Sequence, residues 1–147
     1  MIDELEKKII RAMNQNARKS FREIAKDLGT SATAVVNKVK KLETSGVIRG
    51  YIPIVRPEYF GLDLTAVIAL RISKGKLLET QQRISEDRRV VAVYDVTGEW
   101  DSFVIGRFRG SDDLNDFIKG VQAFPNVDRT VTHLVLNVVK EEKRVPV

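Results

Sequence analysis

The chain has 147 residues, 43% of them hydrophobic, no cysteine and a formal net charge of +5. The absence of cysteine excludes disulfides, thiolate zinc sites and cysteine nucleophiles, and fits a reducing compartment. No apolar run approaches the roughly 20 residues that a membrane span needs, and the N-terminus does not resemble a signal peptide, so we expect a cytoplasmic protein without membrane partners.

The positive charge is concentrated near the N-terminus. Residues 11–41 contain eight Lys or Arg and two acidic residues, whereas residues 64–147 contain thirteen basic and twelve acidic residues. This asymmetry predicts that the N-terminal part meets a polyanion and that the C-terminal part has another task.

Residues 1–50 are predicted to form three helices. Asp3 is a suitable N-cap for the first helix, and Ser20 with Glu23 forms a capping box for the second. Gly29 supplies the left-handed residue that ends the second helix, and Ser31 caps a third helix two residues later. So short a connection makes the two helices cross at a large angle, as in a helix-turn-helix.

The third helix, which extends to about Glu43, has two different faces. Val35, Val39 and Leu42 share the face expected to be buried. The opposite face is polar and basic, with Lys38 on its flank, and a polar helix face after a rigid turn is what reading duplex DNA requires. An ordinary solvated helix surface is the alternative. The face comprises Thr33, Asn37, Lys40, Lys41 and Thr44.

DNA contacts can be assigned to this region by residue type. Base edges are the expected partners of Ser31, Thr33 and Asn37, because Asn can form a two-point pair with adenine. Phosphates are the expected partners of three lysines of the third helix, Lys38, Lys40 and Lys41. Arg22, at the start of the second helix, is expected to hold the DNA backbone or, alternatively, to serve solubility.

The second half of the chain predicts a different domain. Gly46 ends the third helix, and residues 47–55 are expected to form a hinge strand that Pro53 confines to a sheet edge. Strands at 64–72, 90–97, 102–109 and 129–140 alternate with helices at 76–88 and from 111 or 112 onward. This β-α-β-β-α-β order is that of a ferredoxin-like sandwich. Because the strands also predict an apolar second sheet face, we expect a two-fold dimer.

Two stretches resemble the leucine-responsive regulatory protein and asparagine-synthase regulator family, abbreviated Lrp/AsnC. They are E-I-A-K-D-L-G-T-S (23–31) continuing into V-x-x-K-V-K-K-L-E-x-x-G-V-I-R-G-Y (35–51), and T-G-E-W-D (97–101). The resemblance implies a DNA-binding domain, a hinge, and a domain that dimerises and senses amino acids, with dimers assembling into tetramers or octamers. The family commonly has Arg where this chain has Lys38, and Lys lacks the fork that reads guanine.

The expected fold is therefore α+β. A three-helix, winged-type helix-turn-helix domain spans residues 1–50, and a hinge strand or linker spans 51–63. A ferredoxin-like βαββαβ domain spans 64–141 and a tail spans 142–147.

The resemblance places an amino-acid effector at the loop between the middle strands. Asp101 is then the acceptor for the ligand ammonium, and the Gly98 N–H and the Thr97 hydroxyl are donors to its carboxylate, with Trp100 as an apolar wall. The loop residues are Thr97, Gly98, Glu99, Trp100 and Asp101, and weaker candidates are Thr130 and Thr132. The alternative is an ordinary exposed turn, which favours Gly, Asp and Thr anyway.

No cofactor, metal site or catalytic constellation is predicted. His133, the only histidine, is expected to be a partly buried strand residue. The function expected is that of a sequence-specific DNA-binding regulator, modulated by an amino acid. A less selective architectural DNA-binding protein is the first alternative. A tetrapyrrole decarboxylase of the same two-domain layout, with His133 catalytic, is a remote one.

Overall fold

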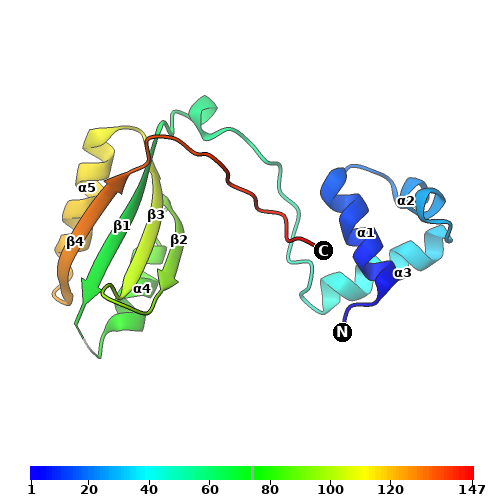
Figure 1. Ribbon diagram of the computed structural model, residues 1–147, viewed down its shortest axis with the longest axis horizontal. Coiled ribbons are helices and arrows are strands. Elements are labelled where there is room, and N and C mark those ends of the chain that lie inside the picture. Colours follow the sequence, from blue (N-terminus) through cyan, green and yellow to red (C-terminus); the bar gives the residue numbers. More distant parts are fainter. Residues whose placement is uncertain (74) are drawn as a thin grey trace. The chain divides into compact units, whose positions relative to one another are not determined.

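The computed structural model describes residues 1–73 and 75–147 and divides into two compact units (Figure 1). One unit comprises Met1–Ile54 together with Glu141–Val147, and the other comprises Val55–Lys140. The first is helical, and the second is a sheet covered by helices.

The predicted helices of the first unit are α1 (Glu4–Gln15), α2 (Phe21–Leu28) and α3 (Ala32–Thr44). Their starts follow the predicted caps, because the Asp3, Ser20 and Ser31 side chains each accept a backbone N–H of the first turn. Gly29 has φ 65°, the left-handed conformation that allows α2 to end and α3 to begin three residues later. A small core joins the three helices through Ile9, Ile24, Ala25, Val35 and Val39.

The hinge strand predicted at residues 47–55 is not formed within the described residues. Residues 47–55 have no strand assignment, and a 3-10 helix, η1 (Pro57–Phe60), follows them. A strand needs a hydrogen-bonded neighbour, and within the described residues this segment has none. The exit from α3 is held instead by the Ile48 N–H on the Leu42 carbonyl at 3.0 Å, and by the Tyr51 hydroxyl on the Glu43 carboxylate at 2.7 Å.

The second unit is the predicted ferredoxin-like sandwich. Within the described residues its sheet has the order β2-β3-β1-β4, with every neighbouring pair antiparallel. Figure 1 shows α4 and α5 behind one face of this sheet. The strands are β1 (Leu64–Ile72), β2 (Val90–Asp95), β3 (Ser102–Phe108) and β4 (Val127–Leu134), and the helices are α4 (Leu77–Ser85) and α5 (Ser111–Gln122).

The last strand ends earlier than the sequence predicts. β4 stops at Leu134, and the Val135 N–H still donates to the Thr65 carbonyl at 2.9 Å. In this register Leu136 lies opposite Leu64, where β1 begins, and residues 137–140 continue beyond that point, so no β1 backbone lies beside them. Their apolar sequence was therefore not sufficient for a strand, because a strand also needs a neighbouring backbone to pair with.

The two faces of the sheet differ in their cover. Ile68, Leu70, Val104 and Phe108 are fully buried beneath α4 and α5. Neither α4 nor α5 packs on the other face, which also carries apolar side chains, most of them only half-buried: Val67, Ala69, Phe103, Ile105 and Val131. This confirms the predicted apolar second face.

Gln81 is a local defect in the packing of α4. Its side chain is 7% exposed, and within the described residues its Nε2 has no hydrogen-bond partner. A buried polar group without a partner costs about 1–3 kcal/mol. We expect Gln81→Met to raise the free energy of unfolding by about 1 kcal/mol in urea titrations. Gln82→Met, at the exposed neighbouring position, should leave it nearly unchanged; a destabilised Gln81→Met would contradict the prediction.

Arg89 joins the start of β2 to α5. Its guanidinium lies 2.7 Å from Asp87, 3.0 Å from Asp113 and 2.9 Å from Asp116, and stacks over the Phe117 ring at 5.2 Å. Arg89→Gln would leave these carboxylates uncompensated. Because the arginine side chain is one quarter exposed, we expect a loss of about 1–2 kcal/mol in unfolding free energy, less than for a fully buried pair.

The contribution of Arg89 should depend on pH. Its hydrogen bond lowers the pKa of Asp87; the pKa of Asp113 is lowered first by the Arg109 backbone N–H and then by Arg89. A carboxyl group with a lowered folded-state pKa stabilises the protein above its unfolded pKa and ceases to do so as the pH falls. The stability difference between the parent and Arg89→Gln should therefore shrink below about pH 4, as urea titrations at several pH values can establish. A constant difference would contradict it.

Candidate nucleic-acid interface and effector loop

The face of α3 opposite the core is exposed. Val35 and Val39 are at most 2% exposed, whereas Thr33, Asn37 and Lys40 are exposed. At the start of the helix, the Ser31 Oγ accepts the Ala34 N–H at 3.1 Å and keeps its own hydroxyl proton for a further bond. The exposed face of α3 thus carries amide, hydroxyl and ammonium groups, while the buried valines on its opposite face hold the helix against the core.

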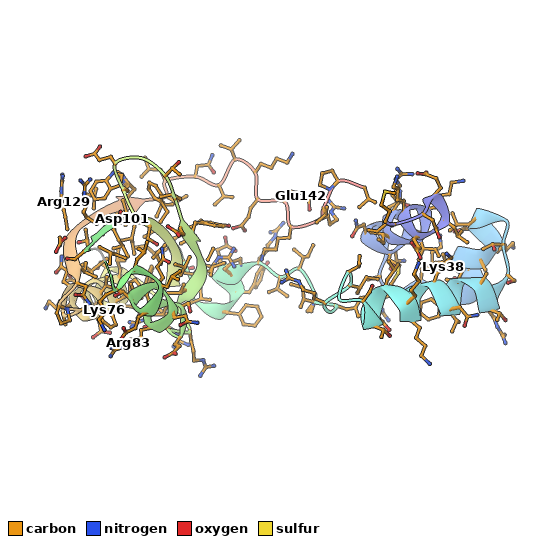
Figure 2. The ribbon with its side chains drawn as sticks, turned by 90° about the horizontal axis from the view of Figure 1, so that it is seen from below. Lys38, Lys76, Arg83, Asp101, Arg129 and Glu142 are labelled. Atoms are coloured by element: carbon orange, nitrogen blue, oxygen red, sulfur yellow. The ribbon has the colours of Figure 1, made fainter. Side chains whose placement is uncertain are left out.

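Two of the lysines predicted to contact phosphates, Lys38 and Lys41, already form ion pairs within the first unit. The Lys38 ammonium contacts the Asp3 carboxylate and lies 3.4 Å from Glu6, and the Lys41 ammonium lies 2.8 Å from the same Glu6 oxygen. Figure 2 shows Lys38 where α3 passes α1. Glu6 is 1% exposed and also accepts the Asp3 N–H at 2.8 Å, so it caps α1 and joins it to α3.

These ion pairs change the charge that the helix presents. The Lys41 hydrogen bond, more than any other contact, lowers the pKa of Glu6, and the Asp3 hydrogen bond raises the pKa of Lys38. Both lysines are thus partly compensated by α1. Sequence reasoning missed this role of Asp3 and Glu6; the available signal was two lysines three residues apart in α3 and two acids three residues apart at the start of α1.

Lys40 and Arg22 are placed differently. Both are exposed, and neither forms an ion pair with any residue that the structure describes. Arg22 lies in the first turn of α2, while the nearby Lys19 pairs with Asp27. Of the predicted phosphate contacts, Lys40 and Arg22 are therefore the cations best able to meet an external anion.

The predicted effector loop lies between β2 and β3 and is fixed to the ends of β1 and β4. The Asp101 N–H donates to the Leu70 carbonyl at 3.0 Å, and one Asp101 carboxylate oxygen accepts the Ile72 N–H at 2.7 Å. The Arg71 guanidinium donates to the Glu99 carbonyl, and that of Arg129 lies 5.1 Å from the centre of the Trp100 ring. Figure 2 shows Asp101 and Arg129 at the same end of the sheet.

The predicted effector residues do not all meet. Trp100 and Asp101 are half-buried, and Thr97, Gly98 and Glu99 are exposed in the same loop.

Thr130 and Thr132 pair in register with Leu70 and Ile68, so they lie on the helix-covered face, where the Thr130 Oγ accepts the Gln122 amide at 3.0 Å. The loop instead meets Arg71 and Arg129, which the sequence reasoning missed.

His133 is exposed, against the expectation of partial burial. It pairs in register with Val67 on the sheet face that no described helix covers, and β4 is an edge strand. Among the residues described, no group of three or more His, Cys, Asp or Glu is placed to hold a metal ion. In the same residues, no helix combines the length and apolar character needed to cross a bilayer.

Two family models match the chain. Residues 2–43 match the AsnC-type helix-turn-helix domain, and residues 65–145 match the Lrp/AsnC ligand binding domain. The matched segments contain α1 and α2 with most of α3, and the four strands of the described sheet apart from Leu64, the first residue of β1.

Similar proteins span the whole chain. An uncharacterized HTH-type transcriptional regulator of Pyrococcus abyssi is 46% identical over 144 residues, 98% of each chain. The HTH-type transcriptional regulator Ptr1 of Methanocaldococcus jannaschii is 34% identical over the full length of both. Among solved structures, AsnC of E. coli superimposes with a TM-score of 0.90, 26% identity and 99% coverage of both chains. A Neisseria meningitidis regulator in complex with L-Met superimposes equally well at 23% identity, covering 99% of this chain and 97% of its own.

Proposed function

The chain belongs to the Lrp/AsnC family of transcriptional regulators, and on this premise we propose that it reads specific duplex DNA sequences with the exposed face of α3. The observation that carries the proposal is the division of α3 into a buried valine face and an exposed face with Thr33, Asn37 and Lys40. Major-groove recognition requires base-reading side chains on a helix that the protein core holds rigidly.

The residues have separate roles in this proposal. Asn37 reads a base edge, with Ser31 and Thr33 beside it at the N-terminal end of α3. Lys40 and Arg22 contact phosphates, and Lys38 and Lys41 join them only when a phosphate displaces the carboxylates of Asp3 and Glu6. Phosphate contacts set the position of the domain on the duplex, and base contacts select the sequence.

A second copy of the chain completes the regulator. We infer that the uncovered apolar sheet face packs against its equivalent in a two-fold dimer, which presents two α3 helices to two half-sites. Dimers associate further in this proposal. An amino acid bound at the loop 97–101 alters that assembly; in support, the Neisseria neighbour of the same fold holds L-Met.

The experiment is the selection of bound sequences from a random duplex pool, repeated with each of the twenty amino acids. A regulator should bind the selected duplex at least ~10³ times more tightly than random DNA at the same salt concentration. A ratio near one would indicate an architectural DNA-binding protein instead, and absence of binding at low salt would refute DNA recognition altogether.

Lys40 and Lys41 should differ in their contribution to DNA affinity. Lys40→Ala is expected to weaken binding to all sequences alike and to reduce the slope of log K against log [salt] by about 0.9, the value of one phosphate contact. Lys41→Ala should have a smaller effect, because Glu6 already holds its ammonium. Fluorescence anisotropy across a salt series measures both slopes. Lys119→Ala, an equal charge change on the exposed surface of α5, is the control, and a parental slope for Lys40→Ala would contradict the assignment.

A further inference from the structure

Two arginines face each other beside the effector loop. Arg71 of β1 and Arg129 of β4 are direct partners in the antiparallel register, so their side chains leave the same sheet face. Because Leu70 and Ile72 point into the helix-covered core, this face is the uncovered one. Like charges directly opposite each other destabilise a sheet, and no ion pair to either guanidinium occurs within residues 1–73 and 75–147.

The loop supplies the rest of a binding site around this pair. Arg71 is held by the Glu99 carbonyl, and Arg129 is held over the Trp100 ring, so both guanidiniums are oriented without being neutralised. The Ile72 N–H holds one oxygen of Asp101, and the other oxygen, Oδ1, has no hydrogen bond to the described residues. Two cations, one carboxylate oxygen and an indole face thus come together at one end of the sheet.

We propose that Arg71 and Arg129 bind the two carboxylates of an acidic amino acid, and that Asp101 Oδ1 accepts its ammonium. This inference rests on the proposed effector function and names the class of effector. The two guanidiniums and the carboxylate of Asp101 carry a net charge of +1, which an amino acid with a second carboxylate neutralises. A neutral amino acid would leave one guanidinium unpaired. Arg is also the side chain that grips a carboxylate at two points.

The test uses pairs of ligands that differ in charge and hardly in shape. Isothermal titration calorimetry of the full-length protein would compare L-glutamate with L-glutamine, and L-aspartate with L-asparagine. We expect at least one acid to bind roughly tenfold or more tightly than its amide, because charge-assisted hydrogen bonds are about twice as strong as neutral ones. Equal affinities within both pairs would overturn the proposal.

Single substitutions test whether the two arginines cause the preference for an acidic amino acid over its amide. Arg71→Gln and Arg129→Gln should each abolish most of the discrimination between acid and amide, and Arg129→Lys should restore part of it by returning the charge without the fork. Arg88→Gln, which removes an exposed arginine before β2, at the end of that strand away from the loop, should keep the parental preference. Thermal melting checks that each variant remains folded.

The remaining outcomes separate this proposal from the proposed function. A neutral amino acid that binds equally well to the parent and to both Gln variants would overturn the arginine subsite and leave effector sensing intact. Failure of all twenty amino acids to bind would overturn the subsite and effector sensing together, while DNA selection is measured independently. Weaker self-association of the Gln variants without ligand, with unchanged ligand affinity, would assign the arginines to a carboxylate of a second copy and likewise overturn the proposal.

Discussion

Replacing Asn37 with alanine is expected to abolish the preference for one base position in the selected DNA, at a cost of about 1–3 kcal/mol in discrimination. An amide that donates to and accepts from one base edge distinguishes that base from the other three, and a methyl group does not. Binding to random DNA should hardly change, because that binding depends on phosphate contacts.

Loss of folding cannot imitate this result. Asn37 is exposed in the middle of α3, and alanine has the higher helix propensity, so the variant should be at least as stable as the parent. The measurement compares affinities for duplexes that carry each base pair at every position of the selected site. Asn115→Ala, the same exchange on the exposed surface of α5, is the matched control. An unaltered preference at every position would remove Asn37 from the base-reading surface.

The local features of the candidate nucleic-acid interface were predictable from the sequence. The caps at Ser20 and Ser31 and the left-handed Gly29 depend on residues three or four positions apart, which a sequence displays directly. The valine face of α3 follows from the same short period. The division of the chain into a helical unit and a sheet unit also follows from these periodicities.

Features that depend on distant residues were not predictable in this way. Glu6 meets Lys38 and Lys41 across more than thirty residues, and a periodic pattern contains no information about which helix surfaces cross. Arg129 meets Trp100 only because β4 lies beside β1 in the sheet. The sequence therefore identified α3 and the loop 97–101 as candidate sites, but not the side chains, such as Glu6 and Arg129, that change the charge around them.

The hinge strand failed for another reason. Residues 47–55 are apolar enough to form a strand, and Ile52 and Ile54 are each 72% exposed. Strand formation, unlike helix formation, needs a neighbour that the segment itself does not contain. The composition of residues 47–55 thus identified a segment able to form a strand, but it could not show whether the chain itself provides a neighbouring strand.

Gly106→Ala is expected to lower the free energy of unfolding by about 2–3 kcal/mol, an overpacking penalty inside the core of the sheet unit. A Cβ atom at Gly106 would lie 2.5 Å from Cζ and 2.7 Å from Cε2 of Phe108, whose ring folds back over the same face of β3. Phe108 is fully buried, with its ring centre 5.3 Å from that of Phe117, so the ring cannot move without displacing α5. Backbone strain is not the reason, because Gly106 has no positive φ.

Gly120→Ala on α5 is the control for this prediction. A Cβ there meets nothing within 4 Å, so the exchange should stabilise the protein by about 0.5–1 kcal/mol through helix propensity. Urea titrations of the parent, of Gly106→Ala, of Phe108→Leu and of the two combined form a double-mutant cycle, and Gly120→Ala is measured beside them. If the steric explanation holds, Gly106→Ala costs much less once the ring is gone. An equal cost with and without the ring would show that Gly106 is required for something other than room for Phe108.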